Sequence, residues 1–247
     1  PPRSTLFPYT TLFRSADEAW IEAFARGFFA CCEAFGIDAI GGDTTRGPLN
    51  LCPTIFGEVP IGQAITRSGA RPGDDLWVSG APGRAALGLA HLQGRTTLAA
   101  PHLDDCLAAL HRPQPRVALG LALRGIASAM LDVSDGLLGD LDHILELSGV
   151  GAEIDHAALP LAPLIAACGD AGLALQACTA GGDDYELLFS APPDRRDALI
   201  AVQNSLQLPL HRIGRLTADT RQVSLRHTDG RLETLTASGY DHFGRSP

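Results

Sequence analysis

The chain has 247 residues, 45% of them hydrophobic and 19% charged, a balance typical of a folded, soluble globular protein. Its formal net charge of −9 argues against a nucleic-acid partner, because no basic stripe is present to neutralise phosphates. No apolar run approaches the ~18 residues needed to cross a bilayer, so no membrane partner is expected.

The first fifteen residues, PPRSTLFPYTTLFRS, repeat Thr-Leu-Phe and share no character with the residues that follow. The only methionine is Met130, so residue 1 is not a natural initiator. We therefore expect residues 1–15 to be a foreign or disordered arm that takes no part in the fold. The protein proper is expected to begin near Ala16, in the middle of a domain.

A helix is predicted directly after this arm. Asp17 is a suitable N-cap, and Trp20, Phe24 and Phe28 recur at every fourth position to form one apolar face. Gly36 is expected to end this helix after Phe35. Strands are predicted at 37–40 and 49–59, followed by a joint rich in Gly and Pro at 60–73.

Strands and helices are predicted to alternate after the joint. The expected strands are 76–79, the run LDVSDGLL at 131–138, 152–154, 211–216 and 222–226, with a TDG turn at 228–230. The expected helices run from SGAPG to about Leu92 and over 103–110, 117–130, 138–147, 161–168 and 195–203. The segment 174–191 is expected to form a strand, a glycine turn and a second strand. This alternation predicts an α/β or α+β fold.

Three turns combine carboxylates with glycine: GGDTT at 41–45, DVSDG at 132–136 and GGDDYE at 181–186. Glycine lets the backbone approach a ligand closely, whereas a carboxylate repels phosphate unless a hard cation lies between them. A single Asp-Gly turn is ordinary turn chemistry. Three of them at strand ends predict a site for Mg²⁺ and a phosphate-bearing ligand.

Several other routes to catalysis are absent from the sequence. There is no Walker A pattern, no protein-kinase glycine loop and no GxSxG elbow. The eight histidines lack metal-ligand spacing, and no covalent catalytic nucleophile is expected. The six cysteines form no CxxC pair, which predicts buried free thiols and a cytoplasmic protein.

The order of the motifs resembles the thiamine-monophosphate kinase family from about Asp17 to Phe243. The motifs are GGDTTRGP, FGEVP, RSGARPGDDLWVSG, RPQPRVALGLAL, LDVSDGLLGDLDHI, GGDDYELLF and GYDHF. GGDDYELLF and GYDHF are the more specific motifs. GGDTT and DxSDGL are less specific, since they are similar to motifs across a superfamily that includes aminoimidazole-ribonucleotide synthetase. The resemblance implies that superfamily's two-domain fold with an incomplete first domain. Residues 16–65 would be the remnant of an N-terminal ATP- and Mg-binding domain, and 66–247 a C-terminal α/β domain.

The resemblance also implies an activity and the residues that carry it. ATP would phosphorylate thiamine monophosphate to thiamine diphosphate by Mg²⁺-assisted, in-line transfer, in a homodimer built through the first domain. The implied ATP contacts are Gly42, Asp43, Arg67 and Ser134. The implied Mg²⁺ ligands are Asp43, Asp132 and Asp135, which we expect around one cleft. The implied substrate contacts are Glu186 and Tyr240, whose ring would stack on the cationic thiazolium.

One departure from the family pattern keeps two other functions open. The family opens with a segment that carries a GDDAA-type motif and further Mg²⁺ ligands, and nothing corresponding precedes Ala16. The chain could therefore be a non-catalytic fragment that binds a nucleotide or thiamine phosphate. A related phosphate-activating synthetase is the other alternative. GYDHF and the lack of a cysteine in a glycine-rich loop argue against a selenophosphate-type enzyme.

Overall fold

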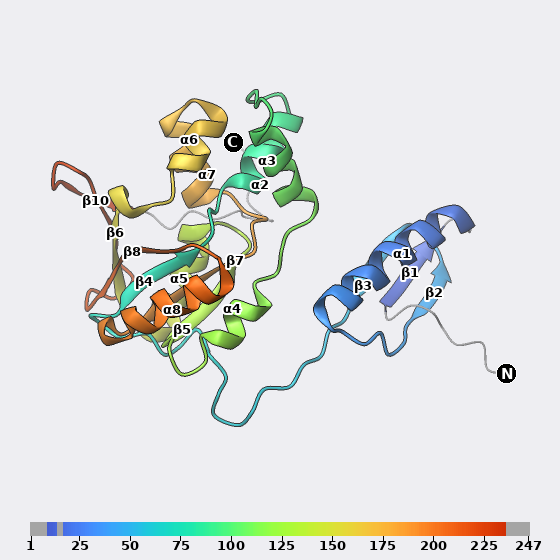
Figure 1. The fold of residues 1–247 in the computed structure, drawn as a ribbon, viewed down its shortest axis with the longest axis horizontal. Helices are drawn as coiled ribbons and strands as arrows, with labels where there is room; N and C mark the ends of the chain where they lie inside the picture. Colours follow the sequence, from blue (N-terminus) through green and yellow to red (C-terminus); the bar gives the residue numbers. More distant parts are fainter. Residues whose placement is uncertain (1–8, 14–16, 236–247) are drawn as a thin grey trace. The chain divides into compact units, whose positions relative to one another are not determined.

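A computed structural model describes residues 9–13 and 17–235. The chain divides into two compact units, residues 1–60 and 61–247, each with its own sheet (Figure 1). The joint between them falls slightly before the 65/66 boundary that the sequence suggested.

The first unit combines one helix with a small sheet. Helix α1 (Glu18–Phe35) begins where the Asp17 carboxylate accepts the Trp20 N–H at 3.1 Å, and it ends at Gly36 with φ 63°. Its sheet has the order β2-β1-β3. The strands are β1 (Tyr9–Phe13), β2 (Asp43–Arg46) and β3 (Asn50–Pro53).

The expectation that residues 1–15 stay outside the fold is wrong for β1. This strand is central, parallel to β2 and antiparallel to β3. The physical reason is that β2 and β3 are short and would otherwise leave their backbone groups unpaired. A second correction concerns the strand expected at 37–40, which does not form, because the Asp-Thr-Thr of the GGDTT motif supplies the strand instead.

The second unit is built on a seven-stranded mixed sheet of order β10-β9-β6-β8-β4-β7-β5. Its strands are β4 (Asp75–Ser79), β5 (Ala129–Val133), β6 (Gly151–Asp155), β7 (Glu186–Ala191), β8 (Leu210–Thr217), β9 (Val223–Arg226) and β10 (Leu232–Leu235). Neighbours pair antiparallel, except β6 and β9, which are parallel. The α+β prediction is therefore confirmed.

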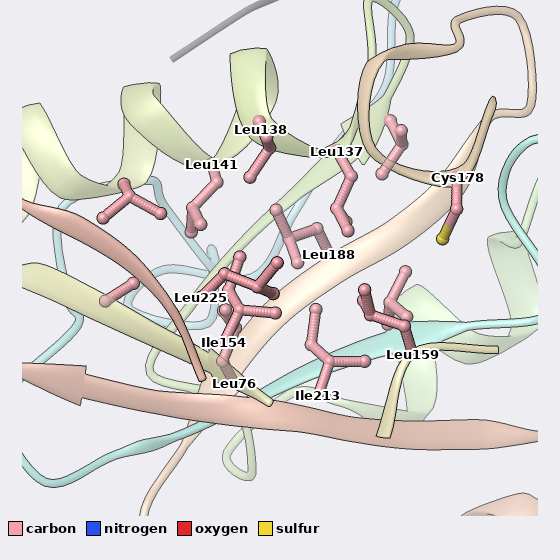
Figure 2. Close-up of a cluster of buried hydrophobic side chains, with 14 of the residues drawn as sticks. Leu76, Leu137, Leu138, Leu141, Ile154, Leu159, Cys178, Leu188, Ile213 and Leu225 are labelled. Carbon is pink, nitrogen blue, oxygen red and sulfur yellow. The ribbon is translucent and has the colours of Figure 1, made fainter. Parts of the chain in front are cut away.

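Helices cover both faces of this sheet. They are α2 (Arg84–Leu92), α3 (His102–His111), α4 (Val117–Ala122), α5 (Leu137–Ser148), α6 (Ala162–Cys168), α7 (Ala171–Ala180) and α8 (Arg196–Leu206), with 3-10 turns at His156–Ala158 and Pro193–Arg195. Side chains alternate along each strand, so Leu76 and Leu188 face α5 and α7 (Figure 2), whereas Trp77 and Phe189 face α4 and α8. The central strands β4 and β7 are thus buried on both sides.

The strands expected at 49–59 and 131–138 end early, at Pro53 and Val133. Two other predicted elements differ more. The helix expected over 117–130 ends at Ala122, and Gly125 with φ 75° reverses the chain so that β5 can pair with β7. The first strand expected in 174–191 is instead helix α7, whose N-cap Asp170 accepts the Leu173 N–H at 2.9 Å. A run of Ala, Leu and Cys, in which Thr179 is the one β-branched residue, favours that helix.

Candidate functional site

Two of the three acidic turns lie side by side in the second unit. The DVSDG turn (132–136) follows β5, and the GGDDYE turn (181–186) leads into β7, which pairs with β5. Beyond the strands, the Asp183 N–H donates to the carbonyl oxygen of Ser134 at 2.9 Å. The Tyr185 N–H likewise donates to the carbonyl oxygen of Val133 at 2.9 Å. The antiparallel pairing therefore continues into both turns.

Glycines make this close approach possible. A Cβ at Gly182 would lie 2.5 Å from the carbonyl oxygen of Ser134. A Cβ at Gly136, where φ is 118°, would lie 2.9 Å from the backbone of Ala180. Any larger residue at either position would push the two turns apart.

Three carboxylates face outward from the two turns. Asp132 and Asp183 are exposed, and Asp135 is half-buried. Burial, and then the charges of these three aspartates, raise the pKa of Tyr185, so all three lie near its ring. Asp183 and Tyr185 hold φ values of 67° and 52°, which non-glycine residues seldom adopt and which are common at ligand sites.

Asp184 and Glu186, which alternate with Asp183 and Tyr185, point inward and fix the GGDDYE turn to the rest of the second unit. The buried carboxylate of Asp184 accepts the N–H groups of Gly83 and, at 3.1 Å, Ala85 at the start of α2. These donors and the helix dipole favour its charged form. Burial outweighs them and raises the pKa of Asp184 to about 6. The turn is therefore anchored to the N-terminus of α2.

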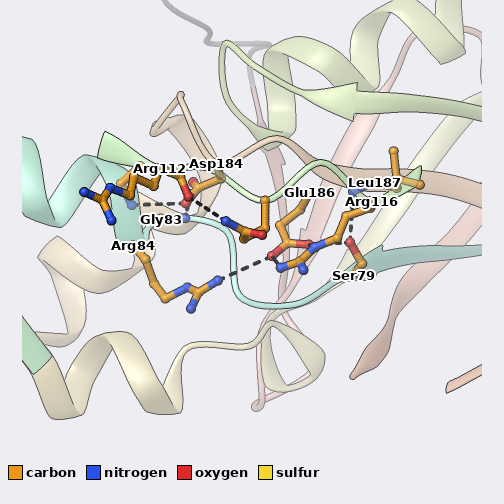
Figure 3. A network of polar contacts seen from close by, with 10 residues as sticks. Ser79, Gly83, Arg84, Arg112, Arg116, Asp184, Glu186 and Leu187 are labelled. Atoms are coloured by element: carbon orange, nitrogen blue, oxygen red, sulfur yellow. Dashed lines mark hydrogen bonds and ion pairs between the residues drawn. The ribbon is translucent and has the colours of Figure 1, made fainter. Parts of the chain in front are cut away.

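Glu186 is the centre of a buried polar network (Figure 3). Arg116 binds both of its carboxylate oxygens, through Nε at 2.7 Å and Nη2 at 2.6 Å. The Ser79 hydroxyl donates to it at 2.6 Å, and Arg84 lies 3.5 Å away. The Glu186 side chain is only 1% exposed. Both oxygens are thus engaged by the chain itself.

A cavity of about 650 Å³ opens beside the two turns. Helices α2 and α7 supply apolar side chains to its walls, including Ala86 and Leu173, and Arg95 and Gln176 add polar groups. Polar groups of the turns lie at its edge, among them Asp135 and Asp183. Apolar walls with a few convergent polar groups are typical of a small-molecule site.

Two expected ATP contacts lie near opposite ends of α5. The carbonyl oxygen of Arg67 accepts the Ser148 hydroxyl at 2.9 Å, at the C-terminal end of α5, whereas Ser134 precedes the N-terminal end. The 12 residues of α5 span ~18 Å. The role of Arg67 at ATP stays a prediction.

Two further expected residues belong to the first unit, and one is outside the described part of the chain. Gly42 and Asp43 belong to the first unit, where the Asp43 carboxylate accepts the Thr44 N–H at 2.8 Å. The grouping of Asp43 with Asp132 and Asp135 stays a prediction. Tyr240 lies outside the described residues.

Sequence reasoning missed two residues of this turn: Asp183 at the edge of the cavity, and Asp184, which anchors the turn to α2. The signal available for both was the alternation of side chains along a strand. Asp183 and Tyr185 fall on one side of the chain, and Asp184 and Glu186 on the other.

The donor set at the DVSDG turn fits Mg²⁺. Asp132 and Asp135 supply hard oxygen ligands, and Mg²⁺ commonly takes one or two carboxylates while it keeps several waters. Within residues 9–13 and 17–235, no three His, Cys, Asp or Glu residues are grouped so as to hold a metal ion. Waters and phosphate oxygens can complete the coordination of an ion held by these two aspartates. In the same part of the chain, no helix is long and apolar enough to cross a membrane.

Comparisons with known proteins match both units to one family. The model of the AIR synthase related protein C-terminal domain matches residues 71–226, and that of the N-terminal domain matches 4–59. The chain is 44% identical to thiamine-monophosphate kinase of Escherichia coli K12, over 92% of this chain and 70% of that protein.

Solved structures agree with these matches. Thiamine-monophosphate kinase from Stenotrophomonas maltophilia K279a is 41% identical, with a TM-score of 0.78, over 92% of this chain and 74% of that one. The structure described as AaThiL complexed with AMPPCP and TMP is 26% identical, with a TM-score of 0.75. That match covers 95% of this chain and 72% of the other.

Proposed function

The chain belongs to the thiamine-monophosphate kinase family of AIR synthase related proteins, and we propose that it transfers the γ-phosphoryl group of ATP to thiamine monophosphate. Thiamine diphosphate is the product. The observation that carries the proposal is the direct pairing of the DVSDG and GGDDYE turns beside a cavity. The relative solved with AMPPCP and TMP supports the same pair of substrates.

The residues of the two turns have distinct tasks in this reaction. Asp132 and Asp135 would hold Mg²⁺, which when bound neutralises charge on phosphate oxygens. The Ser134 hydroxyl, between them in the sequence, donates to a phosphate oxygen of ATP. The phosphate of the substrate attacks in line, so the protein needs no covalent nucleophile.

We assign the acidic substrate contact to Asp183 in place of Glu186. Thiamine monophosphate carries a cationic thiazolium, which an exposed carboxylate at the edge of the cavity attracts. The oxygens of Glu186 are bound by Arg116 and Ser79, so its role is to hold the turn in place. Stacking of Tyr240 on the thiazolium remains part of the proposal.

Steady-state kinetics of Asp135→Asn test the proposed function. The substitution keeps the size of the side chain and removes the charge that holds Mg²⁺. We expect kcat for thiamine diphosphate formation to fall by roughly 10²-fold, as for the loss of one strong electrostatic stabiliser. Asp142→Asn, on the helix α5 that follows the turn and paired with Arg221, is the matched control. Unchanged turnover in Asp135→Asn would contradict the assignment.

Binding without turnover is the second candidate function. Binding requires only the cavity and the two turns, whereas turnover also requires bound Mg²⁺. Calorimetry with ATP and thiamine monophosphate, beside the turnover assay, separates the two functions. Saturable binding of both ligands without any thiamine diphosphate would support the second candidate.

We further propose a homodimer formed through the first unit, in the cytoplasm. Ile40 and Phe56 of that unit are 82% and 80% exposed, and large apolar side chains of this kind are commonly covered by a partner. The six free cysteines suit a reducing compartment. Sedimentation equilibrium of the wild type and of Phe56→Ser tests the dimer, since the substitution should raise its dissociation constant.

A further inference from the structure

The N-terminal end of α5 has the features of an anion-binding site. The DVSDG turn runs directly into α5, whose N-cap is Gly136 and whose cap makes no side-chain hydrogen bond. The backbone N–H groups of a turn, together with the positive end of a helix dipole, ordinarily attract phosphate. A phosphate-binding enzyme would be expected to use them directly.

A buried carboxylate occupies these N–H groups instead. Asp140 lies in the first turn of α5, where side chains point back toward the N-terminus of the helix. Its Oδ2 accepts the Ser134 N–H at 2.9 Å and the Asp135 N–H at 3.0 Å. The residue is only 4% exposed. The two donors are therefore satisfied internally.

We propose that Asp140 is a positioning residue, which converts the DVSDG turn from an anion site into a cation site. By binding the two N–H groups from beneath, its carboxylate keeps them from phosphate and holds the side chains of Asp132 and Asp135 outward. Phosphate then reaches this turn only through a divalent cation. The inference rests on the proposed function, because it concerns the aspartates assigned to Mg²⁺.

Two substitutions of Asp140, with a control at Asp142, separate the position of the carboxylate from its charge. Asp140→Glu keeps the charge but lengthens the side chain by one methylene, so its carboxylate can no longer accept both the Ser134 and the Asp135 N–H groups in the same geometry. Asp140→Ala removes the acceptor and frees both N–H groups. Asp142→Asn removes a charge from the same helix without touching the turn, because its partner is Arg221.

The first measurement is hydrogen exchange at the Ser134 and Asp135 amides, without any metal. We expect exchange at least tenfold faster in Asp140→Glu and in Asp140→Ala than in the wild type. Asp142→Asn should match the wild type. Unchanged exchange in Asp140→Glu would overturn the inference, even if Asp140→Ala failed to fold, and this readout does not depend on the proposed activity.

The second measurement is Mn²⁺ affinity, followed by the paramagnetic resonance of the free ion. Loss of a residue that orients metal ligands typically weakens affinity 10- to 100-fold, and we expect about tenfold for Asp140→Glu. A purely structural role would lower the melting temperature and leave the affinity of the folded protein unchanged. Wild-type affinity in Asp140→Glu would mean that only charge matters, which overturns the inference. Absence of Mn²⁺ binding in the wild type would contradict the proposed function, and the exchange result would still decide the role of Asp140.

Discussion

The Asp183 N–H donates to the carbonyl oxygen of Ser134 at 2.9 Å, and this bond joins the two acidic turns of the second unit. It brings the outward carboxylate of Asp183 beside that of Asp135, at the edge of one cavity. A change that separates the turns should therefore alter stability and ligand binding together.

Gly182→Ala tests this coupling. The new Cβ would meet the carbonyl oxygen of Ser134 at 2.5 Å, closer than any real Cβ contact. We expect a loss of about 1–3 kcal/mol in the free energy of unfolding, with weaker ligand binding. Gly120→Ala in α4 is the control, since its Cβ would have only ordinary contacts, 3.8 Å from Met130. Urea denaturation of both variants checks the prediction, and equal stability would contradict it.

Asp183→Gly should separate stability from function. At φ 67° an aspartate is strained, whereas glycine adopts this conformation without steric cost. We expect the free energy of unfolding to stay level or rise by up to about 1 kcal/mol. Affinity for thiamine monophosphate should fall, because the carboxylate at the edge of the cavity is lost. Thermal denaturation and calorimetry on one preparation measure both quantities, and a variant with undiminished affinity would refute the assignment of Asp183.

Glu186→Gln should destabilise the protein strongly. Arg116 binds both carboxylate oxygens of the buried Glu186, and the lost charge would leave this partly buried guanidinium uncompensated. Breaking a buried pair from one side costs about 3–5 kcal/mol. Glu146→Gln is the control, because its pair with Arg221 is half exposed and is expected to contribute less than about 1 kcal/mol. Similar melting temperatures for the two variants would show that the Glu186 network contributes little.

Local signals account for what the sequence predicted correctly. Helix α1 begins and ends at Asp17 and Gly36, because an N-cap and a left-handed glycine act within a few residues. Strand β4 was recognisable from its apolar run, which is buried along its whole length. The two turns at 132–136 and 181–186 stood out because carboxylates and glycines occur together in them.

Tertiary pairing accounts for what the sequence could not supply. Strand β1 forms because β2 and β3 lie on either side of it, which its own residues do not reveal. The hydrogen bond from the Ser148 hydroxyl to the backbone of Arg67 joins residues 81 positions apart. The engagement of Glu186 by Arg116 depends on a partner 70 residues away. No local pattern encodes such distant contacts.

The titration of Asp184 leads to a prediction of pH-dependent stability. Burial raises its folded-state pKa from an ordinary 3.8 to about 6. Between these values the folded protein keeps a proton that the unfolded chain has released, so stability falls as pH rises through this window. A shift of about two units corresponds to roughly 3 kcal/mol as an upper bound.

Comparison with Asp184→Asn isolates this contribution, because asparagine does not titrate while the other groups are common to both proteins. The amide can accept only one of the N–H groups of Gly83 and Ala85, which costs about 1–3 kcal/mol at every pH. The stability advantage of the wild type should therefore be largest near pH 4 and shrink as the pH approaches 7. Urea denaturation at unit pH intervals measures this difference. A difference that stayed constant, or grew with pH, would mean that the two helix N–H groups outweigh burial and that Asp184 is charged throughout.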